Sequence, residues 1–226
     1  MAPRILALET SGQAGSVALL TGAQVVCERV LPAETRSAQS LAPAIRAALD
    51  QAGWKPPDVQ VVAVTIGPGS FTGLRVGATT AKTFAYATGA AVLGIGTLDC
   101  IAAQAPGRGR LSAVIDAYRR QVFTRTYQCE STGTWLPLDE PHILDDDRWL
   151  ASLANDTRVS GPGLERLVTR LPADTKVAPR ETWTPRAATV GALAYARYTA
   201  GQRDDLWTLA PAYLRRSAAE EKADEK

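Results

Sequence analysis

The chain has 226 residues, of which 46% are hydrophobic and 21% charged, and its formal net charge at pH 7 is +2. This composition is ordinary for a globular protein, and the near-neutral charge gives no overall attraction toward nucleic acid. Three cysteines without a CxxC pair favour a reducing compartment, and neither a signal peptide nor an apolar run of about 20 residues is recognised. We therefore expect a cytoplasmic protein that does not enter a membrane.

The first half of the sequence predicts three antiparallel strands followed by alternating helices and strands. Short apolar runs separated by tight turns indicate the strands, and apolar residues at helical spacing indicate the first helix. The β-branched run VQVVAVTI is typical of a strand that is buried on both faces. The strands are predicted over residues 5–8, 16–20, 24–31, 59–66 and 91–95. The helices are predicted over 38–52, from the end of the GPGSFTG loop to about 88, and from about 97.

The second half repeats this order in a reduced form. LSAVIDA, QVFTRTYQ and TWLPL predict three strands, and short helices and strands follow up to a last helix at 186–200. The sequence therefore predicts an α/β protein in which the order βββαβαβα occurs twice. We expect a first lobe over 1–106, a smaller second lobe over 107–216 whose final helix has the option of packing back on the first lobe, and a flexible tail over 217–226.

The glycine-rich segment GPGSFTGLRVG at 67–77 raises the question of phosphate binding. It fits neither the GxxxxGK[ST] loop, since no lysine follows, nor GxGxxG, since its glycines are spaced one residue too far apart. A structural reading is that the chain turns off a buried strand and that Ser70 or Thr72 caps the next helix. In that helix small residues recur every four positions at Gly73, Gly77 and Ala81, so another backbone is expected to approach closely. The approaching surface is either the protein's own sheet or another subunit.

Catalytic motifs are scarce in this sequence. His142 is the one histidine, so an HxxxH metal pair is not possible. A Ser–His–Asp set would have to use His142, and no GxSxG motif accompanies it. We expect His142 to lie in a loop before a short helix. The acids Asp145 to Asp147 would form the first turn of that helix, where negative charge interacts favourably with the helix dipole. The three cysteines are expected to be buried thiols, at Cys27, Cys100 and Cys129.

Four segments resemble the bacterial TsaB (YeaZ) family, which is part of the actin-like, ribonuclease H-like superfamily. They are ILALETSGQAGSVAL, VTIGPGSFTGLRVGATTAKTFA, VIDAYRRQVF and LAPAYLRR, which together extend over nearly the whole chain. The sequence departs from the family pattern at Glu9, Ser37, Tyr118, Gln121 and Phe123. The resemblance implies a two-lobed protein that works in forming threonylcarbamoyladenosine in tRNA.

The resemblance also implies partners and a binding surface. The implied partners are TsaD, the catalytic paralogue, and TsaE, an ATPase of the same complex; a homodimer is an alternative, and tRNA is reached only through the complex. The implied interface with TsaD or a second copy comprises Ser37, Leu41, Ile45, Phe71, Thr72, Gly73, Arg75, Gly77, Thr80, Ala81 and Phe84. A vestigial nucleotide loop is implied at Glu9, Thr10, Ser11 and Asp116. No cofactor and no metal are expected, although weak nucleotide binding stays open.

The resemblance thus implies a non-catalytic subunit that binds and activates TsaD for threonylcarbamoyl transfer to N6 of adenosine 37 in tRNAs reading ANN codons. The alternative is a separate small-molecule kinase, ATPase or peptidase of the same fold. The missing histidine pair and the lack of a strong glycine-rich adenosine motif in the second half favour the first interpretation.

Overall fold

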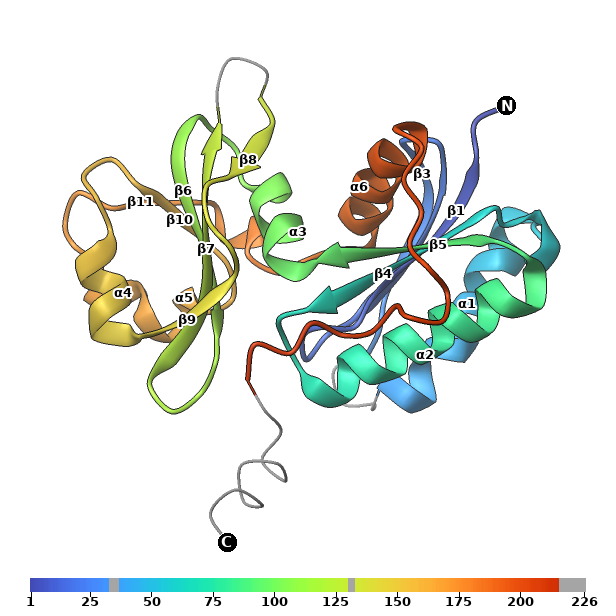
Figure 1. The fold of residues 1–226 in the computed structure, drawn as a ribbon, viewed down its shortest axis with the longest axis horizontal. Coiled ribbons are helices and arrows are strands. Elements are labelled where there is room, and N and C mark those ends of the chain that lie inside the picture. Colours follow the sequence, from blue (N-terminus) through green and yellow to red (C-terminus); the bar gives the residue numbers. More distant parts are fainter. Residues whose placement is uncertain (33–36, 130–132, 216–226) are drawn as a thin grey trace, which may run out of the picture.

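The computed structural model describes residues 1–32, 37–129 and 133–215, with the side chain of Ser37 left out. The predicted interface role of Ser37 and the predicted tail at 217–226 therefore lie outside the described residues. Two β-sheets form two lobes that lie side by side (Figure 1). Among the described residues, no helix has both the length and the apolar character that crossing a membrane requires.

The first lobe contains a five-stranded sheet in the order β3-β2-β1-β4-β5. β1 pairs antiparallel with β2 and parallel with β4. The strands are β1 Arg4–Glu9, β2 Ser16–Thr21, β3 Gln24–Val30, β4 Val61–Gly67 and β5 Ala91–Gly96.

Helices cover both faces of this sheet (Figure 1). Leu6 and Leu8 pack toward α1 and α2, and the alternate residues Ile5 and Ala7 pack toward α6. Because both faces are buried, the central strands are apolar without alternation, as the run in β4 predicted. The helices of this lobe are α1 Ser37–Ala52, α2 Phe71–Thr88, α3 Thr97–Gln104 and α6 Ala187–Thr199, with a short 3-10 turn η1 at Pro56–Asp58.

The second lobe has a six-stranded sheet in which β11, β10, β6, β7 and β8 follow one another and β9 also pairs with β7. α3 covers one face around Leu111 and Tyr127, and α4 and α5 cover part of the other around Val114. Its elements are β6 Gly109–Asp116, β7 Gln121–Cys129, β8 Trp135–Pro137, β9 His142–Asp145, α4 Asp146–Ser152, β10 Arg158–Ser160, α5 Leu164–Leu167, η2 Val168–Arg170, β11 Lys176–Val177 and η3 Arg180–Thr182.

The duplicated lobes match the fold predicted from the sequence, but the second lobe contains a strand that was not expected. The expectation that His142 lies in a loop is wrong, because His142 begins β9 and lies opposite Thr124 of β7. The acids that follow do form the first turn of a helix, since Asp146 and Asp147 begin α4. The three cysteines are buried thiols, as predicted.

The C-terminal part of the chain returns to the first lobe. α6 packs on the first sheet, the arrangement that the sequence left open for the final helix. After α6, Asp204 bridges to Val92 of β5, and the chain then crosses α2. Arg215 donates to the Ala117 carbonyl oxygen of the second lobe at 2.6 Å. Residues 204–215 therefore form a strap that joins the two lobes (Figure 1).

Candidate functional site

The candidate site lies where the first hairpin of each lobe turns, because these are the positions that the sequence singled out for a nucleotide. In the first lobe the turn follows β1 and contains Glu9, Thr10 and Ser11, which are 0%, 0% and 5% exposed. Glu9 Oε1 accepts hydrogen bonds from the backbone N–H and the hydroxyl of Ser11. Glu9 Oε2 has no partner among the described residues. Desolvation by burial raises the pKa of Glu9 to about 7.

The loop between β4 and α2 closes over this turn. The Ser70 N–H donates to the Ser11 carbonyl oxygen at 2.7 Å. A Cβ atom at Gly69 would come within 2.5 Å of the same oxygen, so only glycine allows this approach. The Ser70 hydroxyl accepts from the Gly73 N–H and caps α2, as the sequence predicted for Ser70 or Thr72. The glycine-rich loop therefore packs on the protein's own first turn and is not shaped around a phosphate.

The small residues of α2 are also required by close packing against the first turn. A Cβ at Gly73 would collide with the Thr10 carbonyl oxygen, and one at Gly77 would collide with the Thr10 hydroxyl. Ala81 is buried beside them against the first sheet. The predicted close approach is real, but its partner is the protein's own turn. The expectation that these three positions contact another subunit is therefore wrong.

Two predicted contacts on α1 are corrected for a similar reason. Leu41 and Ile45 are 1% and 6% exposed and belong to the core between α1 and the sheet. Their helical spacing reports the inner face of the helix. Any contact that α1 makes with a partner must use other residues.

The outer side of α2 retains the remaining predicted interface residues. Phe71, Thr72, Arg75, Thr80 and Phe84 are all exposed or partly exposed. The Arg75 guanidinium lies over the Phe71 ring at 3.9 Å, and its Nε donates to the Tyr213 hydroxyl at 2.9 Å. The strap thus orders the side chains at the start of α2 without burying them, and the outer face defined by these five residues stays accessible.

The turn of the second lobe contains Asp116 and three residues with positive φ, Tyr118, Arg119 and Arg120. The left-handed conformation is uncommon for residues other than glycine, and the Tyr118 N–H supports it by donating to Asp116 Oδ1 at 2.9 Å. Arg166 Nη2 donates to the same oxygen at 3.1 Å. Asp116 is therefore already paired inside the protein.

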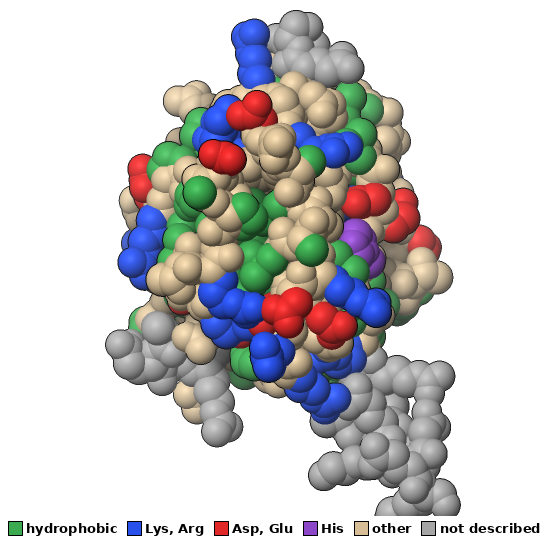
Figure 2. Space-filling view, turned by 90° about the vertical axis from the view of Figure 1, so that its left-hand side faces the viewer, with side chains coloured by type: hydrophobic (Ala, Val, Ile, Leu, Met, Phe, Trp, Pro, Cys, Tyr) green, Lys and Arg blue, Asp and Glu red, His purple; other side chains and the backbone are tan. Residues whose placement is uncertain are grey.

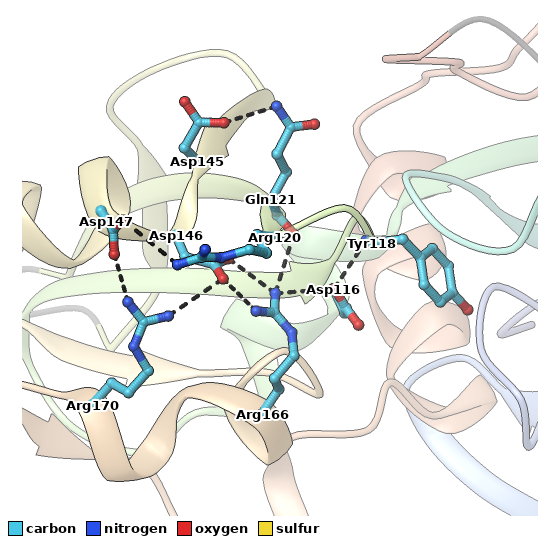
Figure 3. A network of polar contacts seen from close by, with 9 residues as sticks. All are labelled: Asp116, Tyr118, Arg120, Gln121, Asp145, Asp146, Asp147, Arg166 and Arg170. Atoms are coloured by element: carbon cyan, nitrogen blue, oxygen red, sulfur yellow. Dashed lines mark hydrogen bonds and ion pairs between the residues drawn. The ribbon is translucent and has the colours of Figure 1, made fainter.

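A network of acids and arginines surrounds this turn (Figure 3). Asp146 is 1% exposed and accepts hydrogen bonds from Arg166 and Arg170, and Arg170 also pairs with Asp147. The hydrogen bond from Arg166 lowers the pKa of Asp146, and the same contact raises the pKa of Arg166. The sequence analysis missed this network. Its signal is the four-residue spacing of Arg166 in α5 and Arg170 in η2, which brings two cations to the consecutive acids Asp146 and Asp147.

The two turns do not fit a Mg²⁺-bound nucleotide, the group that an actin-like fold implies. Glu9 is buried, and the raised pKa of its carboxyl, about 7, shows that the charged form a hard cation requires is disfavoured there. Asp116 is occupied by a guanidinium. Among the described residues, no group of three or more His, Cys, Asp or Glu side chains could hold a metal ion.

Two lobes of this build, in which the acid of the first turn is buried and the acid of the second turn pairs with an arginine, define a protein of the actin-like class. Residues 30–137 match the family model described as TsaD: tRNA N6-adenosine threonylcarbamoyltransferase.

Two curated relatives and a solved structure are similar to this chain. The chain is 31% identical to the tRNA threonylcarbamoyladenosine biosynthesis protein TsaB of Bacillus subtilis over 68% of this chain and 67% of that protein. It is 34% identical to the protein of the same name from Escherichia coli over 58% of each chain. YeaZ from Pseudomonas aeruginosa has a similar structure, with a TM-score of 0.82 and 29% identity over 94% of this chain and 100% of that chain. The chain belongs to the TsaB (YeaZ) family.

Proposed function

We propose that this protein is the non-catalytic subunit that binds and activates TsaD when threonylcarbamoyl is transferred to N6 of adenosine 37 in tRNAs reading ANN codons. The names of its relatives support a place in threonylcarbamoyladenosine biosynthesis. In the proposed complex TsaE supplies ATPase activity, tRNA binds through the assembled complex, and the protein works in the cytoplasm.

One observation carries the non-catalytic part of the proposal. The acid that a catalytic first lobe would present to a ligand, Glu9, is fully buried beneath the Ser70 loop and α2. A buried carboxyl that no solute reaches cannot take part in transfer or hydrolysis. The outer face of α2 remains exposed beside it. The activity is therefore proposed to depend on surface contact, with TsaD or with a second copy of this chain on the same face.

Reconstitution tests this proposal directly. TsaD, TsaE, tRNA, ATP and the threonylcarbamoyl precursor are combined with and without the purified chain, and modified adenosine is measured by mass spectrometry. We expect modification to require the chain, and sedimentation to show a complex of the chain with TsaD. Equal modification without the chain would contradict the proposal.

The rival interpretation, a separate kinase, ATPase or peptidase, predicts turnover by the chain alone. We expect no metal-dependent ATP or peptide hydrolysis at micromolar protein. Hydrolysis that Asp116→Ala abolishes, while the unfolding transition is preserved, would favour the rival. A strictly monomeric sedimentation profile would remove the homodimer and leave TsaD as the partner of the outer face.

A further inference from the structure

One face of the second sheet is only half covered by helices. The register places Ser112 opposite Thr126 and Thr124 opposite His142, so these side chains share a face with Val114. α4 and α5 pack over the part around Val114 and Trp149. Beyond them the face carries polar residues and stays open. Figure 2 views the second lobe from this side, with hydrophobic side chains in the middle, charged side chains along the lower edge and the single histidine at the margin.

The uncovered part forms a hollow of about 340 Å³, which is the size of a site for a small molecule. Its polar lining includes Arg110, Ser112, Asp139, His142 and Thr157. The hollow lies in the second sheet, apart from the two hairpin turns and from the outer face of α2. Its role is therefore separate from the proposed subunit interface.

A buried hydroxyl in this hollow lacks a partner. Thr157 is 2% exposed, and its Oγ1 forms no hydrogen bond with any residue that the structure describes. Leaving a buried hydroxyl unpaired is unfavourable, so a ligand that bonds to it would gain affinity. Ser112, in contrast, is fixed, because its Oγ accepts from Trp149 Nε1 at 3.0 Å. The indole of Trp149 is thus a reporter for the floor of the hollow.

The imidazole of His142 offers an acceptor. Its Nδ1 lies 2.8 Å from the carbonyl oxygen of Glu140, and a carbonyl oxygen can only accept. Nδ1 therefore carries the proton in the neutral ring, and Nε2 is left with a lone pair. An ammonium group is a suitable donor to this atom.

The lining contains one charge of each sign. Arg110 forms no ion pair within the described part of the chain, so its guanidinium is available for a carboxylate. Asp139 accepts from the Thr126 N–H through Oδ1 at 2.8 Å, and its carboxylate charge remains for a cation. Leu138, Leu144 and Leu153 add an apolar wall. Opposite charges beside aliphatic side chains match a zwitterion better than an anion or a cation.

We propose that this hollow binds a small zwitterion of the aliphatic α-amino acid class. Its carboxylate binds Arg110, its ammonium group binds Asp139 and His142 Nε2, and its side chain packs on the leucines.

Nuclear magnetic resonance titration of the ¹⁵N-labelled full chain tests this proposal. The probes are L-leucine, 4-methylpentanoate, which lacks the ammonium group, and 3-methylbutylamine, which lacks the carboxylate. We expect leucine to shift the Trp149 indole signal saturably, with an affinity at least about tenfold above either analogue. The indole of Trp207, in the strap on the first lobe, serves as the internal control.

Three variants assign the two charges. Arg110→Gln should reduce leucine to the affinity of 3-methylbutylamine, and Asp139→Asn, which keeps an acceptor for Thr126, should reduce it to that of 4-methylpentanoate. Arg108→Gln, a neighbouring exposed arginine outside the lining, should leave all three affinities unchanged. A Trp149 signal that does not saturate, an analogue that binds as tightly as leucine, or an Arg110→Gln variant that binds leucine normally would each overturn the proposal.

Discussion

The first hairpin turns of the two lobes occupy equivalent places in the fold, yet they withdraw their acids from ligands in different ways. Glu9 is buried under the Ser70 loop, where desolvation raises its pKa to about 7 and favours the neutral form. Asp116 remains partly exposed, and an ion pair with Arg166 satisfies it. One turn is closed by packing and the other by charge pairing. The comparison shows that equivalent turns of a duplicated fold can hold their acids by different means, one by burial and one by ion pairing.

The largest effect should follow from breaking the charge pairing of the second turn. Arg166→Met removes the main partner of Asp146, which is 1% exposed, and leaves a buried carboxylate with Arg170 as its remaining close partner. We expect the free energy of unfolding to fall by about 3 kcal/mol, the lower end of the cost of breaking a buried pair, because Arg170 still compensates part of the charge. Urea denaturation measures it.

A matched variant separates this effect from the loss of a surface arginine. Arg180→Met removes an exposed partner of Glu165 and should change stability by less than about 1 kcal/mol. Adding Asp146→Asn to Arg166→Met should recover part of the loss, since the unpaired charge is then gone. Similar losses for Arg166→Met and Arg180→Met would show that Asp146 does not depend on its pairing.

The packing of the first turn should appear as a pH dependence. The folded state holds the proton on Glu9 up to a pKa of about 7, whereas the unfolded chain releases it near the ordinary 4.5. Stability should therefore decrease as pH rises from about 4.5 to about 7, by about 3 kcal/mol in total. Glu9→Gln should remove this decrease and be the more stable protein above pH 7.

The measurement is the difference in free energy of unfolding between wild type and Glu9→Gln at each pH. Subtraction cancels groups that titrate alike in both proteins. Glu165→Gln, at an exposed position, should follow the wild-type curve throughout. A Glu9→Gln curve parallel to wild type from pH 4.5 to 8 would mean that Glu9 titrates normally in the folded protein.

A smaller effect distinguishes the inner side of α2 from the outer side. Replacing a helical glycine with alanine usually stabilises a protein by about 0.5–1 kcal/mol. Gly77→Ala should instead destabilise this protein by about 1–3 kcal/mol, because the new Cβ meets Thr10. Thermal unfolding of Gly77→Ala beside Thr79→Ala, an exposed position of the same helix, checks the sign. A more stable Gly77→Ala would refute the packing against the first turn.

The sequence predicted the duplicated order of elements well, because buried strands and amphipathic helices have local patterns. It also predicted a close approach at Gly73 and Gly77, but not to what, since an internal turn and a foreign subunit select the same small residues. β9 was missed because His142 to Asp145 is short and acidic at its end, and only pairing with β7 makes it a strand. The network of Arg166 and Asp146 joins positions twenty residues apart, so the spacing of Arg166 and Arg170 indicates two neighbouring cations but not the acid that they meet.

One comparison tests whether this protein acts through the outer face of α2 or through its first turn. Modification of tRNA is measured with TsaD and TsaE and with either Glu9→Gln or Arg75→Glu at neutral pH. Neither variant should lower the free energy of unfolding by more than about 0.5 kcal/mol, since Arg75 is exposed and Glu9→Gln keeps an acceptor for Ser11. We predict full modification with Glu9→Gln and a loss of modification and of TsaD binding with Arg75→Glu. Lost modification with a stably folded Glu9→Gln, together with normal activity of Arg75→Glu, would contradict the account.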